Sequence, residues 1–231
     1  MRKNHNFVRP LLAVVLATVC GVSQAATISF DDTYGPVAVP STTITVPLPK
    51  FDPTLGTLTK VTLTLDAETS AGTISWDNEA PVASDITLGI GAEVTATAPS
   101  ALTAVAVPLQ TDSGQTDADN DGAADFLGTD AFAVTGGSGS DSDMDMSTLP
   151  ATLALYTATF LGETFDTTID SAVETFLSTS GGFGPIDPVP GITEGMVTVT
   201  YEYVPIPEPA TFTLAGIGCL ALALLARRRR S

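Results

Sequence analysis

The sequence predicts an all-β protein folded as an antiparallel β-sandwich, of the jelly-roll or immunoglobulin-like kind. Val61, Leu63 and Leu65 alternate with polar residues, which places them on one face of a strand. Pro, Gly, Asn and Asp separate such stretches, and helical periodicity is scarce. Residues 26–205 are enough for one domain, which would bury about 70% of its unfolded-chain surface.

About nine strands are expected. They lie at Thr27–Phe30, Thr42–Leu48, Lys60–Asp66, Thr73–Asp77, Ile86–Thr97, Leu102–Leu109, Asp130–Thr135, Thr152–Phe160 and Met196–Val204. This number of short strands favours a sandwich. Ile169–Leu177 is the one modest helix candidate of the body, and residues 111–148, rich in Ser, Gly and Asp, predict an acidic loop.

The C-terminal residues have the order of a sorting tail. Pro207, Glu208 and Pro209 can continue neither a helix nor a central strand. The apolar run 210–226 would span about 25 Å as a helix, near the short limit for a transmembrane segment. Four arginines at 227–230 would stay on the cytoplasmic side, which places the body outside.

This tail, Val204 to Ser231, resembles the PEP-CTERM sorting domain of Gram-negative bacteria that make exopolysaccharide. The resemblance implies that an exosortase recognises Pro207, Glu208 and Pro209 and cleaves the tail. The alternative is a plain single-span membrane anchor. Both interpretations place the body outside the cytoplasm.

The N-terminus has the pattern of a secretory signal peptide over residues 1–25. Basic residues precede the apolar stretch Leu11–Val19, and Ser23-Gln24-Ala25 is a small-x-small site, so cleavage is expected between Ala25 and Ala26. Cys20 would suit a lipoprotein signal, but Val19 stands where a small residue is expected. The body 26–205 contains no cysteine, so disulfides do not stabilise it.

The exported body is strongly acidic. Of nine basic residues only Lys50 and Lys60 lie in it, and of 26 acidic residues only Glu208 lies outside, so its formal charge is 2 minus 25, or −23. Such a surface disfavours nucleic acid and anionic lipid, whereas cations and neutral polymers remain as partners. The alternative is that the acidity only keeps an exported protein soluble.

The body also resembles the choice-of-anchor E family, exported β-rich domains that carry one of several anchoring tails. The resemblance rests on the residues 51–58, Phe-Asp-Pro-Thr-Leu-Gly-Thr-Leu, on Asp125–Thr129 and on the closing strand Met196–Val204. It implies a fold and a location, and no catalytic residues.

One acidic stretch has the spacing of a calcium loop. Its candidate ligands are Asp117, Asp119, Asp121, Asp125 and, later, Asp130. Gly122 would allow the sharp turn, but Gly128 stands where an EF-hand has glutamate, so the shorter calcium loops of extracellular modules fit better. The alternative is a solvated acidic loop.

Missing residue types argue against an enzyme. The only histidine, His5, lies in the signal peptide, and the body has no arginine and no thiol. This removes Ser-His-Asp and Cys-His catalysis and arginine clamps for phosphoryl groups. Carboxylate pairs for glycoside hydrolysis are too abundant to be a signal, and the single Trp76 is expected in the core.

Two function classes follow from the sequence. The first is a structural or matrix protein of the cell envelope, outer surface or exopolysaccharide, held transiently in the inner membrane with a cytoplasmic C-terminus before exosortase cleavage. The second is a glycan- or partner-binding adhesion module, either with or without a dependence on calcium. Loop-borne recognition on a sandwich leaves no fixed motif, so both classes remain open.

Overall fold

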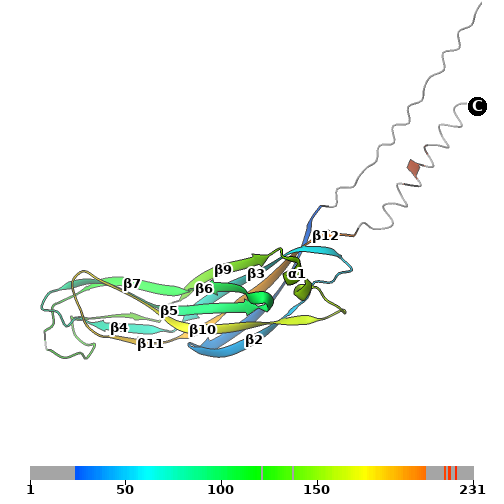
Figure 1. The fold of residues 1–231 in the computed structure, drawn as a ribbon. Helices are drawn as coiled ribbons and strands as arrows, with labels where there is room; N and C mark the ends of the chain where they lie inside the picture. The colour runs from blue at the N-terminus through cyan, green and yellow to red at the C-terminus, as the bar shows by residue number, and fades with distance from the viewer. Residues whose placement is uncertain are drawn as a thin grey trace, which may run out of the picture.

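The computed structural model describes residues 24–206 except positions 121 and 137, and within the tail Gly216, Gly218, Cys219 and Leu222. The described chain is mostly strand, and its strands pair antiparallel in three sheets (Figure 1). The prediction of an all-β fold with antiparallel sheets is therefore confirmed.

Two large sheets form the sandwich. The first has the order β1 (Ala26–Ala38), β12 (Ile192–Pro205), β3 (Gly56–Ser70) and β9 (Gly139–Ser147). The second has the order β2 (Ser41–Pro49), β10 (Thr164–Thr179), β5 (Ser84–Ala98) and β6 (Leu102–Ala106), with β7 (Leu109–Thr116) pairing β5 as well. A small third sheet joins β11 (Ile186–Val189), β4 (Thr73–Asp77) and β8 (Ala131–Thr135).

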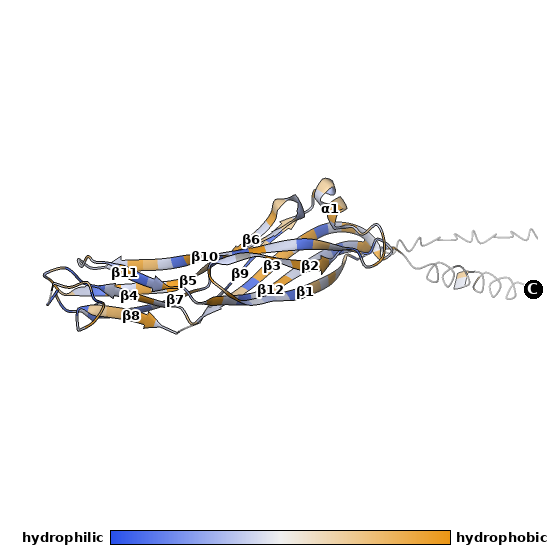
Figure 2. Ribbon diagram, turned by 90° about the horizontal axis from the view of Figure 1, so that it is seen from below, coloured by the Kyte–Doolittle hydropathy of each residue, from blue (hydrophilic) through white to orange (hydrophobic). Residues whose placement is uncertain are grey.

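The main core lies between the two large sheets. Val61, Leu63 and Leu65 on β3 are fully buried, as their alternation predicts, and Val197 and Val199 on β12 lie beside them. Residues of the opposite sheet complete the same cluster, among them Val46, Val94, Ala104 and Ile169. Apolar and hydrophilic bands alternate along these strands in Figure 2, as expected where one face of each sheet is buried and the other is solvated.

A second, smaller core lies at the end of the sandwich away from the tail (Figure 1). It consists of Ile74, Trp76, Ile86, Leu88, Ile90 and Val134. Trp76 is fully buried, which confirms its predicted place in the core and excludes it as an exposed stacking surface.

A row of aspartates joins the edges of the two large sheets. The donors are backbone N–H groups of β6 and of Val107, the residue that follows it, and the acceptors are Oδ2 atoms of β9. Val107 donates to Asp141, Val105 to Asp143 and Thr103 to Asp145, at 2.7, 2.8 and 3.0 Å. We call these three contacts the aspartate ladder. It satisfies edge N–H groups that would otherwise be free to pair with another strand.

Two predicted elements have the wrong type. Thr152–Phe160 is not a strand, because α1 spans Pro150–Tyr156, with proline in its first turn and Thr152 and Tyr156 buried on one face. Ile169–Leu177 is not a helix but part of β10, because β2 and β5 pair with β10 on either side. Tertiary pairing outweighs the weak helical spacing there.

Two predicted boundaries also change. Leu102–Leu109 is two strands, since Val107 and Pro108 separate β6 from β7, and proline has no N–H for a ladder. The acidic loop predicted at 111–148 is mostly strand. Only residues 117–130 connect β7 to β8, and the Asp-rich part after residue 138 forms β9.

The predictions for both chain ends fall largely outside the described residues. This applies to the signal sequence up to residue 23 and to nearly all of the apolar run 210–226. Among the residues that the structure describes, no helix is both long and apolar enough to cross a bilayer.

The aspartate ladder can be tested at its central rung. Asp143→Ala leaves the Val105 N–H without its acceptor and should lower the free energy of unfolding by about 1 kcal/mol. Asp143→Asn keeps an acceptor oxygen and should cost clearly less. Urea unfolding followed by circular dichroism measures both variants; equal losses would contradict a role for this hydrogen bond.

Candidate functional site

The predicted calcium-loop residues lie on the connection between β7 and β8. Asp119 Oδ1 accepts the Gly122 N–H at 2.8 Å, and Asp125 Oδ1 accepts the Leu127 N–H at 2.9 Å. Asp117 is exposed, and Asp121 lies outside the described residues. Within the described part of the chain, no three acidic side chains converge as a metal-ligand group.

Asp130 differs from the other aspartates of this loop because it is buried. Its side chain is 3% exposed, and its Oδ2 accepts the Asn120 N–H at 3.1 Å. Its Oδ1 has no hydrogen-bond partner in the described structure. A Cβ on Gly128 would sit 2.8 Å from this Oδ1, and Gly128 has a φ of +88°, so only glycine fits above the carboxylate.

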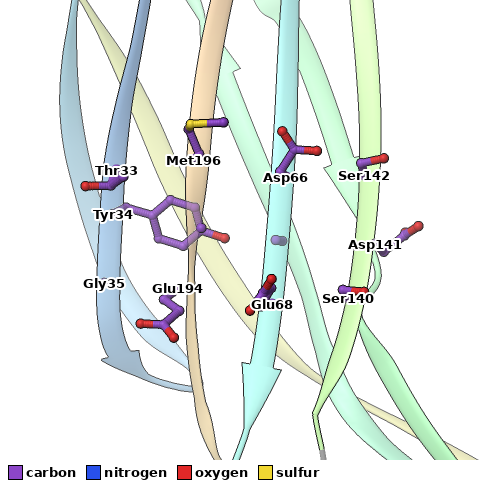
Figure 3. Close-up of a pocket in the computed structure, with 12 residues that line it drawn as sticks. Thr33, Tyr34, Gly35, Asp66, Glu68, Ser140, Asp141, Ser142, Glu194 and Met196 are labelled. Atoms are coloured by element: carbon purple, nitrogen blue, oxygen red, sulfur yellow. The ribbon is translucent and has the colours of Figure 1, made fainter.

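A second candidate is a groove on the first large sheet, which we call the acidic groove (Figure 3). It has a volume of about 890 Å³, and carboxylates and hydroxyls line it. They belong to Thr33, Tyr34, Asp66, Glu68, Ser140, Asp141, Ser142 and Glu194. These residues come from four neighbouring strands, β1, β12, β3 and β9.

Two glutamates of the acidic groove oppose each other. Glu68 on β3 pairs directly with Glu194 on β12 in the strand register. Like charges in this position are destabilising, and no ion pair of the described chain involves either residue. The groove therefore has an uncompensated negative field that a cationic or hydrogen-bond-donating ligand would relieve.

Tyr34 provides the buried polar atom of the acidic groove. Its side chain is 4% exposed, and its hydroxyl has no partner of hydrogen-bond geometry among the described residues. Gly195 makes room for the ring, since a Cβ there would lie 2.8 Å from the hydroxyl oxygen. Burial is the main cause that raises the pKa of Tyr34, so the hydroxyl stays protonated.

The third candidate is the junction with the sorting tail. β12 ends at Pro205, which pairs with Gly56, and the next residue, Ile206, donates its N–H to the Leu55 carbonyl at 3.2 Å. Hydrogen bonding to the domain therefore extends as far as Ile206. The predicted processing residues Pro207, Glu208 and Pro209 follow directly and lie outside the described residues.

An ion pair holds a loop beside this junction. Lys50 Nζ donates to Glu163 Oε1, and the N–H and hydroxyl of Thr159 donate to Glu163 Oε2 at 2.7 and 2.9 Å. The Lys50 hydrogen bond, with these Thr159 contacts, lowers the pKa of Glu163 to about 2.

The predicted signal-peptidase residues lie at the same end. Ala25 is exposed and precedes β1, and Ala26 is the first residue of β1 and pairs with Tyr203.

The acidic groove was not predicted from the sequence. Glu68 and Glu194 are 126 positions apart and become neighbours only through strand register.

Comparison with known proteins identifies the C-terminal segment. The PEP-CTERM protein-sorting motif matches residues 205–230, which begin at the last residue of β12. The chain is thus an exported protein that an exosortase processes at its C-terminus.

The body has no comparably informative match. No curated protein matches the chain. Among solved structures it is similar to two of infectious bursal disease virus, from the Gt and Gx strains, at 11% and 12% identity and TM-scores of 0.12 and 0.13. These alignments cover 90% and 81% of this chain but only 48% and 42% of the viral chains. Such low TM-scores carry no argument about fold or function.

The Glu163 contacts predict a pH dependence of stability. Because the pKa falls from 4.5 to about 2 on folding, the carboxylate stabilises the fold above pH 4.5, and this contribution is lost as the pH falls towards 2. Glu163→Gln should therefore lower the melting temperature at pH 7 and have less effect near pH 2. Thermal unfolding at both pH values measures this.

Lys50→Met is the partner control for Glu163. It removes the largest cause of the pKa shift, so the stability of this variant should change less between pH 7 and about 2 than that of the wild type. A Glu163→Gln effect of equal size at both pH values would contradict the assignment.

Proposed function

We propose that the chain is a structural protein of the cell surface or exopolysaccharide matrix, retained there after exosortase cleavage. One observation carries this proposal. The sorting motif begins at Pro205, the last residue of β12, so the folded body directly precedes the processing site. Cleavage near Pro207 would release or transfer the whole sandwich without cutting a strand.

The same proposal covers the two ends of the precursor. A signal peptide cleaved between Ala25 and Ala26 would leave β1 complete, because Ala26 is its first residue. The run 210–226 would cross the inner membrane, with Arg227–Arg230 in the cytoplasm of a Gram-negative cell. This anchoring is temporary in the proposal, since exosortase removes the tail.

The body suits a non-enzymatic matrix role. It has a formal charge of 2 minus 25, and its residue types leave no histidine or arginine for catalysis. We also propose that it belongs with the choice-of-anchor E domains. Supporting this, Phe51 is buried and Gly56 packs so close to β12 that a Cβ there would meet the Val204 carbonyl oxygen at 2.1 Å.

The acidic groove favours an alternative, a glycan- or partner-binding adhesion module. Carboxylates accept hydrogen bonds from sugar hydroxyls, and Ser140, Ser142 and Tyr34 can both donate and accept. A glycan-array signal from the purified full-length chain that Glu68→Gln and Glu194→Gln abolish would favour this alternative. Calcium-dependent self-association without glycan binding would favour the matrix role.

Calcium is the cation that we propose for the loop 117–130. Asp130 supports this, because a buried carboxylate oxygen without a partner is costly unless a cation neutralises it. Asp117, Asp119, Asp121 and Asp125 would provide further oxygens at the spacing of a calcium loop. The affinity expected for an extracellular module is a Kd of about 0.1 to 1 mM.

Processing can be tested by intact-mass measurement of the protein from the native envelope and from the medium. We expect a C-terminus between Pro207 and Ala210, because exosortase cleaves at the Pro-Glu-Pro motif. Glu208→Ala should keep the complete apolar tail. A full-length mass for the wild-type protein would instead indicate a plain membrane anchor.

Calcium binding can be tested by thermal unfolding. At a Kd of about 1 mM, about 10 mM calcium should stabilise the fold by about 1.4 kcal/mol. Asp130→Asn keeps the shape of the side chain but removes its charge, so this variant should fold and lose the calcium-dependent shift. Asp166→Asn, on the distant strand β10, is the matched control and should keep it.

An unchanged calcium shift in Asp130→Asn, or no shift in the wild-type protein, would refute the site. A parallel thermal-unfolding titration with magnesium separates specific calcium binding from general screening of the acidic surface. Screening should stabilise the wild type and both variants alike, whereas the loop should discriminate between the two ions.

A further inference from the structure

A tight turn beside the tail junction exposes two large apolar side chains. Phe160 is 66% exposed and Leu161 is 89% exposed. The Glu163 N–H donates to the Phe160 carbonyl at 3.4 Å, and Gly162 has a φ of +83°, as the third residue of a type II turn requires. Leu161 therefore stands at the tip of the turn.

Hydrogen bonds and an ion pair at Glu163, the last residue of the turn, hold the turn in place. Glu163 accepts from Lys50 Nζ and from both donors of Thr159, and the Lys50 N–H donates to the Glu163 carbonyl at 2.9 Å. The two apolar side chains thus project from a fixed loop. Such a loop loses little conformational entropy when it binds a surface, because its conformation is already set.

The turn belongs to the end of the sandwich from which the sorting tail leaves. Phe160 and Leu161 line an apolar groove of about 580 Å³ together with Ile28, Phe30 and Leu55. The Leu55 carbonyl accepts the N–H of Ile206, the residue that precedes the Pro-Glu-Pro motif. Figure 1 shows α1 and the end of β12 at this same end.

Chain length limits how far this end can lie from the tail. Only residues 207–209 separate Ile206 from the apolar run that starts at Ala210. Four steps along a fully extended chain span at most about 14 Å. If residue 210 enters the hydrocarbon, the interfacial region of the bilayer lies within reach of this end of the domain.

We propose that the Phe160–Leu161 turn inserts into the outer surface of the inner membrane and sets the body end-on before cleavage. This inference rests on the proposed anchoring by residues 210–226. Phenylalanine and leucine at the edge of a bilayer bury apolar surface without needing anionic lipid, which the acidic body would avoid. The contact would present the processing motif at a fixed height above the membrane.

The test uses the full-length chain in phosphatidylcholine vesicles whose acyl chains carry bromine near the headgroup. Phe160→Trp places a fluorophore in the turn. Phe183→Trp is the matched control, since Phe183 is 62% exposed and its neighbour Gly182 packs against Trp76 at the other end. Native Trp76 is fully buried and gives the same background in both variants. Carbonate extraction of the same vesicles reports separately whether the tail spans the membrane.

We expect bromine to quench most of the added emission in Phe160→Trp and none of it in Phe183→Trp. No quenching in either variant, with the protein still resistant to carbonate, would overturn the turn contact and leave the membrane-anchored precursor intact. Quenching in both variants would overturn the end-on placement. Extraction by carbonate would refute the anchoring itself.

Discussion

The sandwich depends on satisfying the backbone groups at the edges where its two sheets meet. On one side the chain passes from β1 directly into β2, so the two edge strands are consecutive. On the other side β6 and β9 belong to different sheets, and aspartate side chains of β9 connect the two edges. Side chains at every second position point the same way along a strand, so alternate aspartates match alternate N–H groups from Thr103 to Val107. A part of the acidic composition therefore has a structural purpose.

The other charged side chains of the body differ in whether they form ion pairs. Both lysines of the body are paired, Lys50 with Glu163 and Lys60 with Glu202 at 2.6 Å. Glu163 and Glu202 both lie near the tail junction, so the two ion pairs stabilise this end of the domain. Elsewhere carboxylates face each other across strands, as Glu68 and Glu194 do. Such pairs cost stability unless cations screen them, so the fold should be more stable at higher ionic strength.

Sequence patterns predicted the strands well where burial has a clear period of two. Val61 to Leu65 and Val197 to Tyr201 are the best examples, and Thr73–Asp77 is a strand with the same bounds. The patterns failed where local preference and tertiary context differ. Thr152 to Tyr156 suggested a strand by composition, although Pro150 starts a helix there. Ile169 to Leu177 had a weak helical spacing, but pairing with β5 along its whole length makes it part of β10.

The export tail, the charge and the lack of histidine, arginine and cysteine in the body could be read from the sequence alone, because these depend on which residues are present and in what order. The sequence also determined the all-β class, through the alternation of apolar and polar residues. Which distant residues meet became visible only in the folded chain. The acidic groove, the aspartate ladder, the buried Asp130 and the exposed turn at Leu161 all depend on strand register or loop packing. Register is a long-range property, since a shift of one residue would turn every side chain of a strand to the opposite face.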